Sequence, residues 1–318
     1  MGVPTETVYG LAADAFQPLA VARIFEAKER PLTDPLIVHL PEAAWLERVV
    51  RFDSLKQGEL VEKLAAVFWP GPLTLILPKQ PALPDLVTAG SEQVAVRVSA
   101  HPLFQEVIRL VGSPLAAPSA NRFGSISPVS AEDVHSELGK SISWILDGGP
   151  CLHGLESTIL SVSDEGMEIL RPGPVTEEEL KRFGHIIPRG SREHAVNTPG
   201  SLPGHYAPKK ILSILESDIK TFSPDPKTGL LSFQTPEPEI ASRFEAVKVL
   251  SPSGDLREAA ANFYAALRSL DQSESDMIIS ERLPEKGIGV AIMDRLRRAS
   301  HGSRHGTGNQ VLSQPLQS

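Results

Sequence analysis

Short apolar runs that alternate with amphipathic stretches constrain the fold of this chain more than any other feature of its sequence. From residue 1 to about Phe183, apolar runs bounded by Pro and Gly predict buried strands at LIVHL, LTLIL, VAVRV, PLAAP, SWILDGG and STILSV. Helical spacing marks LAVARIFEAKE, FDSLKQGELVEKLAAVFW, HPLFQEVIRLVG and SAEDVHSELG, and TEEELKRFG adds a helix with Thr176 as its N-cap and Gly184 after its end. Strands that alternate with helices in this way predict an α/β fold.

Changes of composition divide the chain into four parts. Residues 1–183 form the first domain, and residues 184–209, rich in Pro, Gly, Ser and His, predict a linker without regular secondary structure. Residues 210–300 predict a smaller α/β domain with strands at ILSILES, TGLLSFQ and AVKVLS and an amphipathic helix at DLREAAANFYAALRSLDQS. The run GVAIMDRLRRAS fits a strand or a strand that continues into a helix. The polar residues 301–318 predict a disordered tail.

Composition predicts a cytoplasmic protein that does not associate with membranes. The chain has 318 residues, 41% of them apolar, and so can bury a sizeable core. It has neither an apolar run of about 18 residues nor an apolar signal core. The single cysteine, Cys151, fits a reducing compartment, and we expect a buried small residue there rather than a nucleophile. A net charge of -8 argues against broad binding to nucleic acid but leaves room for a local basic cleft.

Polar side chains crowd the segment PTETVYG near the start of the chain. If this segment is a strand, alternation places Thr5 and Thr7 on one face and Glu6 on the other. Two hydroxyl groups on one face fit a solvated sheet edge as well as a polar site. The segment alone leaves both interpretations open.

The segment KERPLTDPLIVH favours an anionic ligand. Lys28 and Arg30 stand at the end of a predicted helix, where cations also stabilise the helix dipole. Two prolines then impose an extended path that leads to His39 within an apolar strand. Two cations and an imidazole near a strand end suit a nucleoside triphosphate. The sequence has neither a GxxxxGK[ST] nor a GxGxxG motif, so this phosphate site is not one of those common kinds.

Further polar residues follow other predicted strands. Ser119, Asn121 and Ser127 lie in APSANRFGSISP, Ser157 begins STILSV, and Arg171 precedes a Pro-Gly turn. Such residues either form turns or donate hydrogen bonds to an oxygen-rich ligand. Because these clusters all stand at strand ends of one domain, we expect a concave site there.

Seven motifs together, in this order, resemble the YrdC-like family of threonylcarbamoyl-AMP synthases: PTETVYGLAADA, KERPLTDPLIVH, WPGPLTLIL, VAVRVSAHP, APSANRFGSISP, ESTIL and LRPGP. The later TPGSLPGHYAP and the second α/β domain resemble the longer, two-domain form of the family. The resemblance implies a twisted mixed sheet with flanking helices, plus the smaller C-terminal domain. It also implies that a helix and an apolar strand ordinarily precede PTETVYG, where this sequence has only Met1, Gly2 and Val3.

The resemblance implies a nucleotidyltransferase reaction in which L-threonine, bicarbonate and ATP give L-threonylcarbamoyladenylate and pyrophosphate, with Mg²⁺ accompanying ATP. The product then serves the machinery that modifies a tRNA adenosine, and a weak contact with tRNA is expected. Chemically, the threonine amine captures CO2 as a carbamate, whose oxygen attacks the α-phosphate. No covalent protein nucleophile is expected, so positioning and charge neutralisation remain for the enzyme.

The resemblance also assigns residues to the two substrates. On the threonine side it implies Thr7, His39, Arg97, Ala117 and Ser157, with the Arg97 guanidinium on the carboxylate. On the ATP side it implies Lys28, Arg30, Ser119, Asn121, Ser127 and Arg171, and also Asp34 as an adenine-side or metal-side group. His205 and Tyr206 of the linker are implied as a lid.

Two other readings share this fold. One is an RNA-binding module without synthase activity, in which Lys28, Arg30, Arg97, Arg122 and Arg171 line a basic concavity; the net negative charge and the lack of interleaved aromatic residues weigh against it. The other is a carbamoyl-phosphate-using maturation factor, which ordinarily carries zinc-finger and acylphosphatase modules that this sequence lacks.

Overall fold

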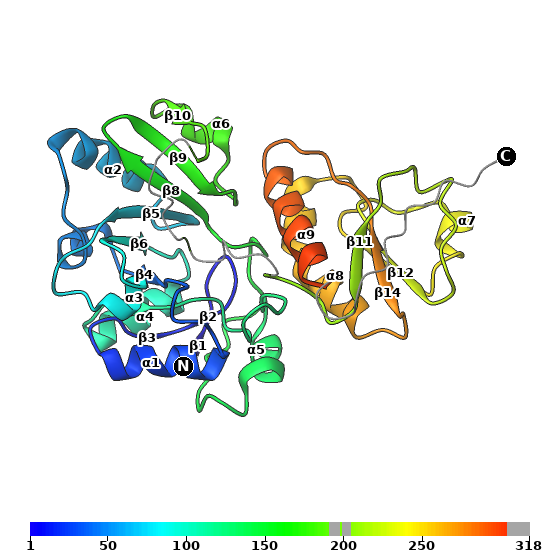
Figure 1. Ribbon diagram of the computed structural model, residues 1–318, viewed down its shortest axis with the longest axis horizontal. Helices are drawn as coiled ribbons and strands as arrows, with labels where there is room; N and C mark the ends of the chain where they lie inside the picture. The colour runs from blue at the N-terminus through cyan, green and yellow to red at the C-terminus, as the bar shows by residue number, and fades with distance from the viewer. Residues whose placement is uncertain (191–197, 199–204, 304–318) are drawn as a thin grey trace.

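The computed structural model describes residues 1–190, 198 and 205–303, and they form two α/β lobes that lie side by side (Figure 1). Both lobes follow the predicted alternation of strands and helices. Within the described residues, no helix is long and apolar enough to cross a membrane.

A mixed sheet forms the centre of the first lobe. In the described part of the chain it has eight strands, in the order β10 (Ile186–Ile187), β9 (Gly166–Arg171), β8 (Thr158–Ser163), β5 (Leu73–Pro78), β6 (Gln93–Arg97), β4 (Ile37–His39), β7 (Leu115–Ala116) and β3 (Ala13–Asp14). The pairs β4–β6, β5–β8 and β9–β10 are parallel, and the other neighbours are antiparallel. The predicted twisted mixed sheet is confirmed.

Helices and a small hairpin complete this lobe (Figure 1). The hairpin pairs β1 (Gly2–Val3) with β2 (Gly10–Leu11). The helices are α1 (Pro18–Lys28), the 3-10 helix η1 (Ala43–Arg48), α2 (Leu55–Phe68), α3 (Asp85–Thr88), α4 (Pro102–Val111), α5 (Ala131–Leu138) and α6 (Glu177–Leu180). Thr176 caps α6 as predicted, since its hydroxyl accepts from the Glu179 amide while the Glu179 carboxylate accepts from the Thr176 amide.

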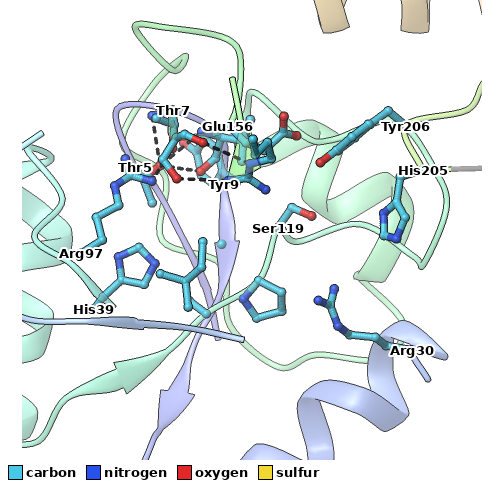
Figure 2. Close-up of a pocket in the computed structure, with 17 residues that line it drawn as sticks. Thr5, Thr7, Tyr9, Arg30, His39, Arg97, Ser119, Glu156, His205 and Tyr206 are labelled. Carbon is cyan, nitrogen blue, oxygen red and sulfur yellow. Dashed lines mark hydrogen bonds between the residues drawn. The ribbon is translucent and has the colours of Figure 1, made fainter. Parts of the chain in front are cut away.

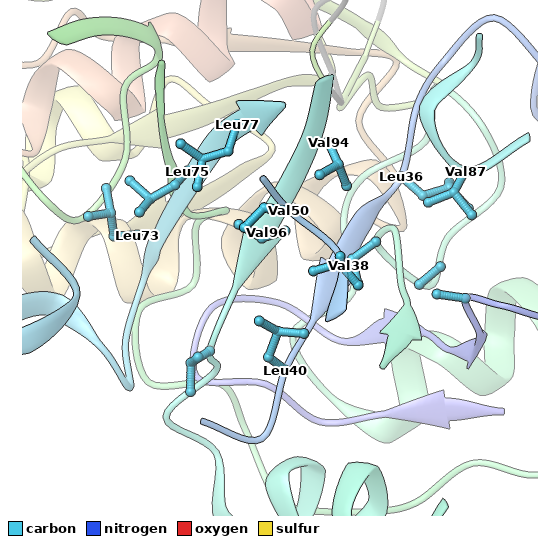
Figure 3. Close-up of a cluster of buried hydrophobic side chains, with 14 of the residues drawn as sticks. Leu36, Val38, Leu40, Val50, Leu73, Leu75, Leu77, Val87, Val94 and Val96 are labelled. Carbon is cyan, nitrogen blue, oxygen red and sulfur yellow. The ribbon is translucent and has the colours of Figure 1, made fainter. Parts of the chain in front are cut away.

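Alternate residues of a central strand point to opposite faces of the sheet, and both faces are covered, which explains why these strands are mostly apolar. In β5, Leu73, Leu75 and Leu77 pack into the main core together with the valines of β6 (Figure 3). The intervening Ile76 packs on the opposite face of the sheet, against Ala95. Because both faces are covered, every residue of β5 is buried, and Thr74 is its only polar residue.

The C-terminal lobe is a parallel sheet with two long helices. Its described strands follow the order β11 (Ile211–Ile214), β14 (Met277–Ser280), β12 (Thr228–Ser232) and β13 (Ala246–Val249). Helices α8 (Leu256–Asp271) and α9 (Gly289–Ser303) lie on the side of this sheet that faces the first lobe, and the short α7 (Pro238–Ala241) lies at the far side (Figure 1).

The two lobes share an apolar core. Val8, Ile126, Val129 and Leu155 of the first lobe belong to the same buried cluster as the inner faces of α8 and α9. Shared burial of this kind joins the lobes by the same force that holds each lobe together. The C-terminal lobe is therefore packed against the first lobe rather than tethered to it.

Several local predictions are wrong. PTETVYG is a loop, SWILDGG contributes only an isolated bridge at Ile145, and GVAIMDRLRRAS lies entirely within α9. The sequence analysis did not predict strand β14. It also did not predict strand β10, which lies within the residues predicted as a linker and pairs with β9. For the apolar segments among these, a short apolar run allows strand or helix, and neighbouring elements decide between them.

Gly154 of the first lobe lies directly against the backbone of α8, and it provides a test of the lobe interface. Its φ is +65°, and a Cβ there would lie 2.4 Å from the Ala261 carbonyl oxygen. We expect Gly154→Ala to lower the free energy of unfolding by roughly 3 kcal/mol, from backbone strain together with overpacking. Thermal and urea unfolding measure the loss.

The matched control for that prediction is Gly149→Ala. Gly149 also has a left-handed φ, +77°, but a Cβ there meets no atom within 4 Å. It should lose only about 1 kcal/mol from the backbone conformation. Equal losses in the two variants would contradict the close packing of the lobes at Gly154.

Candidate functional site

A small cavity of about 50 Å³ lies where the ends of β4, β6, β7 and β8 meet the loop of residues 4–9. Ten of the fourteen residues implied by the family resemblance line it: Thr7, Arg30, His39, Arg97, Ala117, Ser119, Ser157, Arg171, His205 and Tyr206. Figure 2 shows Arg97 and His39 at one end and Arg30 and His205 at the other. The remaining four, Lys28, Asp34, Asn121 and Ser127, lie behind this lining.

Hydroxyl groups shape the loop PTETVYG. Thr5 Oγ1 donates to the Val8 carbonyl at 2.6 Å and accepts from the Thr7 and Val8 amides at 3.1 and 3.2 Å. Its oxygen also lies 2.8 Å from Thr7 Oγ1. These local bonds replace a strand ladder, as short hydroxyl side chains often do. The expected strand alternation is thus wrong, and Thr7 reaches the pocket from a turn.

A buried ion pair joins this loop to β6. Arg97 Nη2 lies 2.6 Å from Glu6 Oε1, and Ser99 donates a hydrogen bond to the same carboxylate. Burial by itself raises the pKa of Glu6, but the neighbouring Arg97 charge and these hydrogen bonds lower it to about 2. The sequence analysis placed Glu6 on the face away from Thr7, whereas the structure brings both residues to Arg97.

The Arg97 guanidinium is engaged on three sides. Nε donates to the Gly71 carbonyl at 3.1 Å, Nη1 donates to Thr7 Oγ1 at 3.0 Å, and Nη2 pairs with Glu6. These partners fix the orientation of the side chain within the wall of the pocket. A carboxylate ligand at this position would share the guanidinium with Glu6, and the assignment of Arg97 to threonine remains a prediction.

His39 is a neutral imidazole inside the pocket wall. It stands at the end of β4, and its ring centroid is 5.0 Å from that of Phe104. Burial and the nearby Arg97 charge lower its pKa from 6.5 to about 3. The ring therefore offers a donor and an acceptor near neutral pH without adding charge.

Lys28, the last residue of α1, and Arg30, two residues beyond it, are both buried. Lys28 Nζ donates to the carbonyls of Ser119 and Asn121 at 2.6 and 2.5 Å. Arg30 pairs with Asp34 at 2.9 Å, and Nε of Arg30 donates to the Asp34 carbonyl at 3.1 Å. Lys28 thus supports the loop that carries Ser119, while Arg30 itself reaches the cavity.

Ser157 and Arg171 form a second polar wall. Ser157 Oγ lies 2.7 Å from Thr74 Oγ1, and Arg171 Nη2 donates to Ser157 Oγ at 3.1 Å. Arg171 Nε donates to the Ser157 carbonyl at 3.1 Å. The antiparallel pairing of β8 with β9 brings these residues together from positions 14 apart in the chain.

The sequence analysis missed Glu156, which also lines the cavity. Ser127 Oγ donates to its carboxylate at 2.6 Å, and Tyr264 and Arg295 reach it from the C-terminal lobe. An available signal was its place in ESTIL, directly before a predicted site residue. Its two partners in the C-terminal lobe lie more than 100 residues away, so sequence spacing could not indicate them.

His205 and Tyr206 close one side of the cavity. The His205 ring lies edge-on to Phe123 at a centroid distance of 4.7 Å, and its Nε2 is 3.6 Å from Asp34 Oδ2. Burial and the Arg30 and Lys28 charges lower the pKa of His205 to about 3. Both side chains are buried, and residues 199–204 before them lie outside the described residues.

The arrangement suits an anionic ligand with polar groups along its length. Guanidinium groups stand near both ends, and hydroxyl groups and neutral imidazoles lie beside them (Figure 2). Charges in a site with little water act more strongly than on a surface, so a carboxylate or phosphate would be held firmly.

Comparison with known proteins gives matches over nearly the whole chain. The Sua5_yciO_yrdC family model, described as telomere recombination, matches residues 1–173, and the Sua5_C model, described as the threonylcarbamoyl-AMP synthase C-terminal domain, matches residues 175–301. The chain is 41% identical to threonylcarbamoyl-AMP synthase of Bacillus subtilis strain 168, over 94% of this chain and 88% of that protein. It is 37% identical to that of Pyrococcus abyssi, over 93% and 89%.

A solved structure has the same two-lobed architecture. It is P. abyssi Sua5 complexed with L-threonine, which superposes with a TM-score of 0.85 at 37% sequence identity. The superposition covers 95% of this chain and 90% of the other. Both lobes are therefore shared with that protein.

The buried histidines predict a loss of stability in mild acid. His39 takes up a proton near pH 6.5 when the chain is unfolded but only near pH 3 when it is folded, so stability falls as the pH falls below about 6.5. Between about pH 7 and pH 5, we expect the wild-type free energy of unfolding to fall by about 2 kcal/mol more than that of His39→Gln. Urea unfolding at several pH values measures the difference.

His135→Gln, at an exposed position of α5, is the control for this measurement. It should follow the wild-type pH profile. If the His39→Gln profile also runs parallel to the wild-type one, His39 does not remain neutral in the folded protein.

Proposed function

The chain belongs to the threonylcarbamoyl-AMP synthase family, and from this premise we propose that it makes L-threonylcarbamoyladenylate from L-threonine, bicarbonate and ATP, with release of pyrophosphate. A relative whose structure is described as a complex with L-threonine supports threonine as a substrate. The proposed enzyme class is a nucleotidyltransferase.

One observation carries the proposal. A single cavity brings together Arg97, Thr7 and Ser157 with Arg30 and Arg171, although these residues come from five separate segments (Figure 2). In the proposed binding mode, threonine lies beside the loop of residues 4–9, where hydroxyl groups can read its own hydroxyl. The triphosphate lies toward Arg30 and Arg171, whose charges offset its negative charge.

The proposed reaction has two steps. The threonine amine and bicarbonate form a carbamate with loss of water. A carbamate oxygen then forms a bond to the α-phosphorus of ATP, and the bond from that phosphorus to the bridging oxygen of pyrophosphate breaks. The protein contributes by holding the carbamate and the α-phosphate in line and by stabilising charge on the leaving group.

The buried walls suit a product that water destroys. The mixed carbamate–phosphate anhydride is labile, so exclusion of water favours its survival. A cavity of about 50 Å³ holds only a few waters, and a nucleotide requires the walls to separate. We propose that His205 and Tyr206 move aside for entry and return over the bound substrates, as their predicted lid role requires.

We propose that Mg²⁺ binds together with ATP. Three carboxylates stand at the pocket or directly behind its lining, and each is paired with a guanidinium: Glu6 with Arg97, Asp34 with Arg30, and Glu156 with Arg295. Within the described residues, no group of three or more His, Cys, Asp or Glu side chains could hold a metal ion. These paired carboxylates do not fit a protein-held Mg²⁺ site.

The proposed product requires a second reaction that uses it. A threonylcarbamoyl adenylate is an activated acyl donor, so we propose that it passes to machinery that transfers the threonylcarbamoyl group to a tRNA adenosine, with weak direct contact between this chain and tRNA.

Pyrophosphate release tests the proposed function. We expect release from ATP only when both L-threonine and bicarbonate are present, with the adenylate detected by mass spectrometry in the same sample. Omission of either co-substrate is the control. No release with all three substrates, together with tight RNA binding, would instead favour the RNA-binding module.

Substrate choice gives a sharper prediction. A missing methyl group costs about 1–3 kcal/mol of discrimination, so serine should turn over poorly but detectably. Valine keeps the size of threonine but leaves the hydroxyl-reading groups of the pocket unpaired, so it should turn over more slowly than serine. Comparison of kcat/KM for the three amino acids measures this order, and equal values for threonine and valine would contradict a pocket that reads the hydroxyl.

A further inference from the structure

Glu156 belongs to the pocket of the first lobe, but the C-terminal lobe holds its carboxylate. Tyr264 OH of α8 lies 3.0 Å from both carboxylate oxygens, and Arg295 Nε of α9 donates to Oε2 at 2.8 Å. The only other hydrogen bond to this carboxylate in the described part of the chain comes from Ser127, at 2.6 Å. Most of the support for this pocket residue thus crosses the lobe interface.

Arg295 touches a second part of the pocket wall. Its side chain is fully buried, and the carbon of its guanidinium lies 5.4 Å from the centroid of the Tyr206 ring. Nη1 of the same guanidinium pairs with Asp294 at 2.7 Å. One side chain of α9 therefore contacts both Glu156 and Tyr206, which line the cavity from different segments.

The charges of Arg295 and Glu156 explain why the contact between them matters for ligand binding. Burial alone raises the pKa of Glu156, but the Arg295 and Arg171 charges and the Ser127 hydrogen bond hold it below its usual range, so the carboxylate stays ionised. A buried carboxylate without a partner is costly and draws the nearest cation to itself. Arg171 is the other cation whose charge acts on Glu156, so without Arg295 we expect Arg171 to turn toward this carboxylate and away from Ser157.

We propose that Arg295 is a positioning residue of the pocket, which acts from the C-terminal lobe by fixing Glu156 and Tyr206 and by keeping Arg171 in its hydrogen bonds with Ser157. Tyr264 supports the same carboxylate. The C-terminal lobe is then a part of the binding site rather than an appended module. The phosphate ligand in this inference rests on the proposed function, whereas the orientation of Glu156 does not.

A second ion-paired contact between the lobes provides the matched control. Arg268 of α8 pairs with Asp133 and Glu137 of α5, each at 3.1 Å, and donates to the Ile126 carbonyl at 2.9 Å. It does not line the pocket. Loss of Arg268 weakens the lobe interface without touching Glu156, so it separates docking from positioning.

Steady-state kinetics of Arg295→Met and Arg268→Met test the inference. We expect Arg295→Met to raise the KM for ATP about tenfold, while Arg268→Met changes it less than about twofold. A purely structural role would lower the fraction of folded enzyme, and so the apparent kcat, with KM unchanged. Equal KM values in the two variants would overturn the proposal.

A double-mutant cycle with Glu156→Gln tests whether Arg295 acts through Glu156. If it does, Arg295→Met and Glu156→Gln each impair ATP use, and the double variant is no worse than the more impaired single variant. Losses in kcat/KM that multiply in the double variant would mean that the two residues act independently, and the positioning role would be wrong.

Hydrogen exchange keeps the inference testable if the proposed reaction is absent. Backbone amides of residues 155–158 should exchange faster in Arg295→Met than in Arg268→Met, since only the first variant releases Glu156. Unchanged or equal exchange in the two variants would overturn the positioning role. A wild-type protein that releases no pyrophosphate would refute the proposed function alone, and the exchange result would still decide the role of Arg295.

Discussion

Pairing of buried charges is the constraint on which the pocket depends. A site for an anionic ligand needs cations away from water, and each such cation is costly to bury unless a counter-charge or a set of carbonyls accompanies it. Arg97 has Glu6, Arg30 has Asp34, and Lys28 has two backbone carbonyls. These partners fix the side chains before any ligand arrives, so a ligand meets groups that are already oriented.

The residues that make the fold rigid and the residues that form the site lie in different kinds of secondary structure. Central strands such as β5 are buried on both faces and supply rigidity, whereas the polar groups stand on loops and at strand ends. The shared apolar core then places α8 and α9 against the back of the pocket, which lets Arg295 reach Glu156. Packing between the lobes and geometry within the site are therefore coupled.

Sequence reasoning succeeded where a feature is local. The apolar pleat of β5, the capping box at Thr176 and the long amphipathic helix α8 all depend on neighbours a few residues away, and all were predicted. It failed where a distant partner decides the outcome. Glu156 lies beside a predicted site residue and was not predicted, because Tyr264 and Arg295, which hold it, are more than 100 residues away.

The sequence by itself determined the α/β class and predicted ten of the residues that line the pocket, because periodicity and ordered motifs are properties of the chain alone. Only the tertiary structure decided that PTETVYG turns, that Glu6 meets Arg97, and that Glu156 is held from α9. The reason is physical: a buried charge takes its partner from whatever segment the packing of the core brings within about 3 Å, however far apart the two lie in sequence.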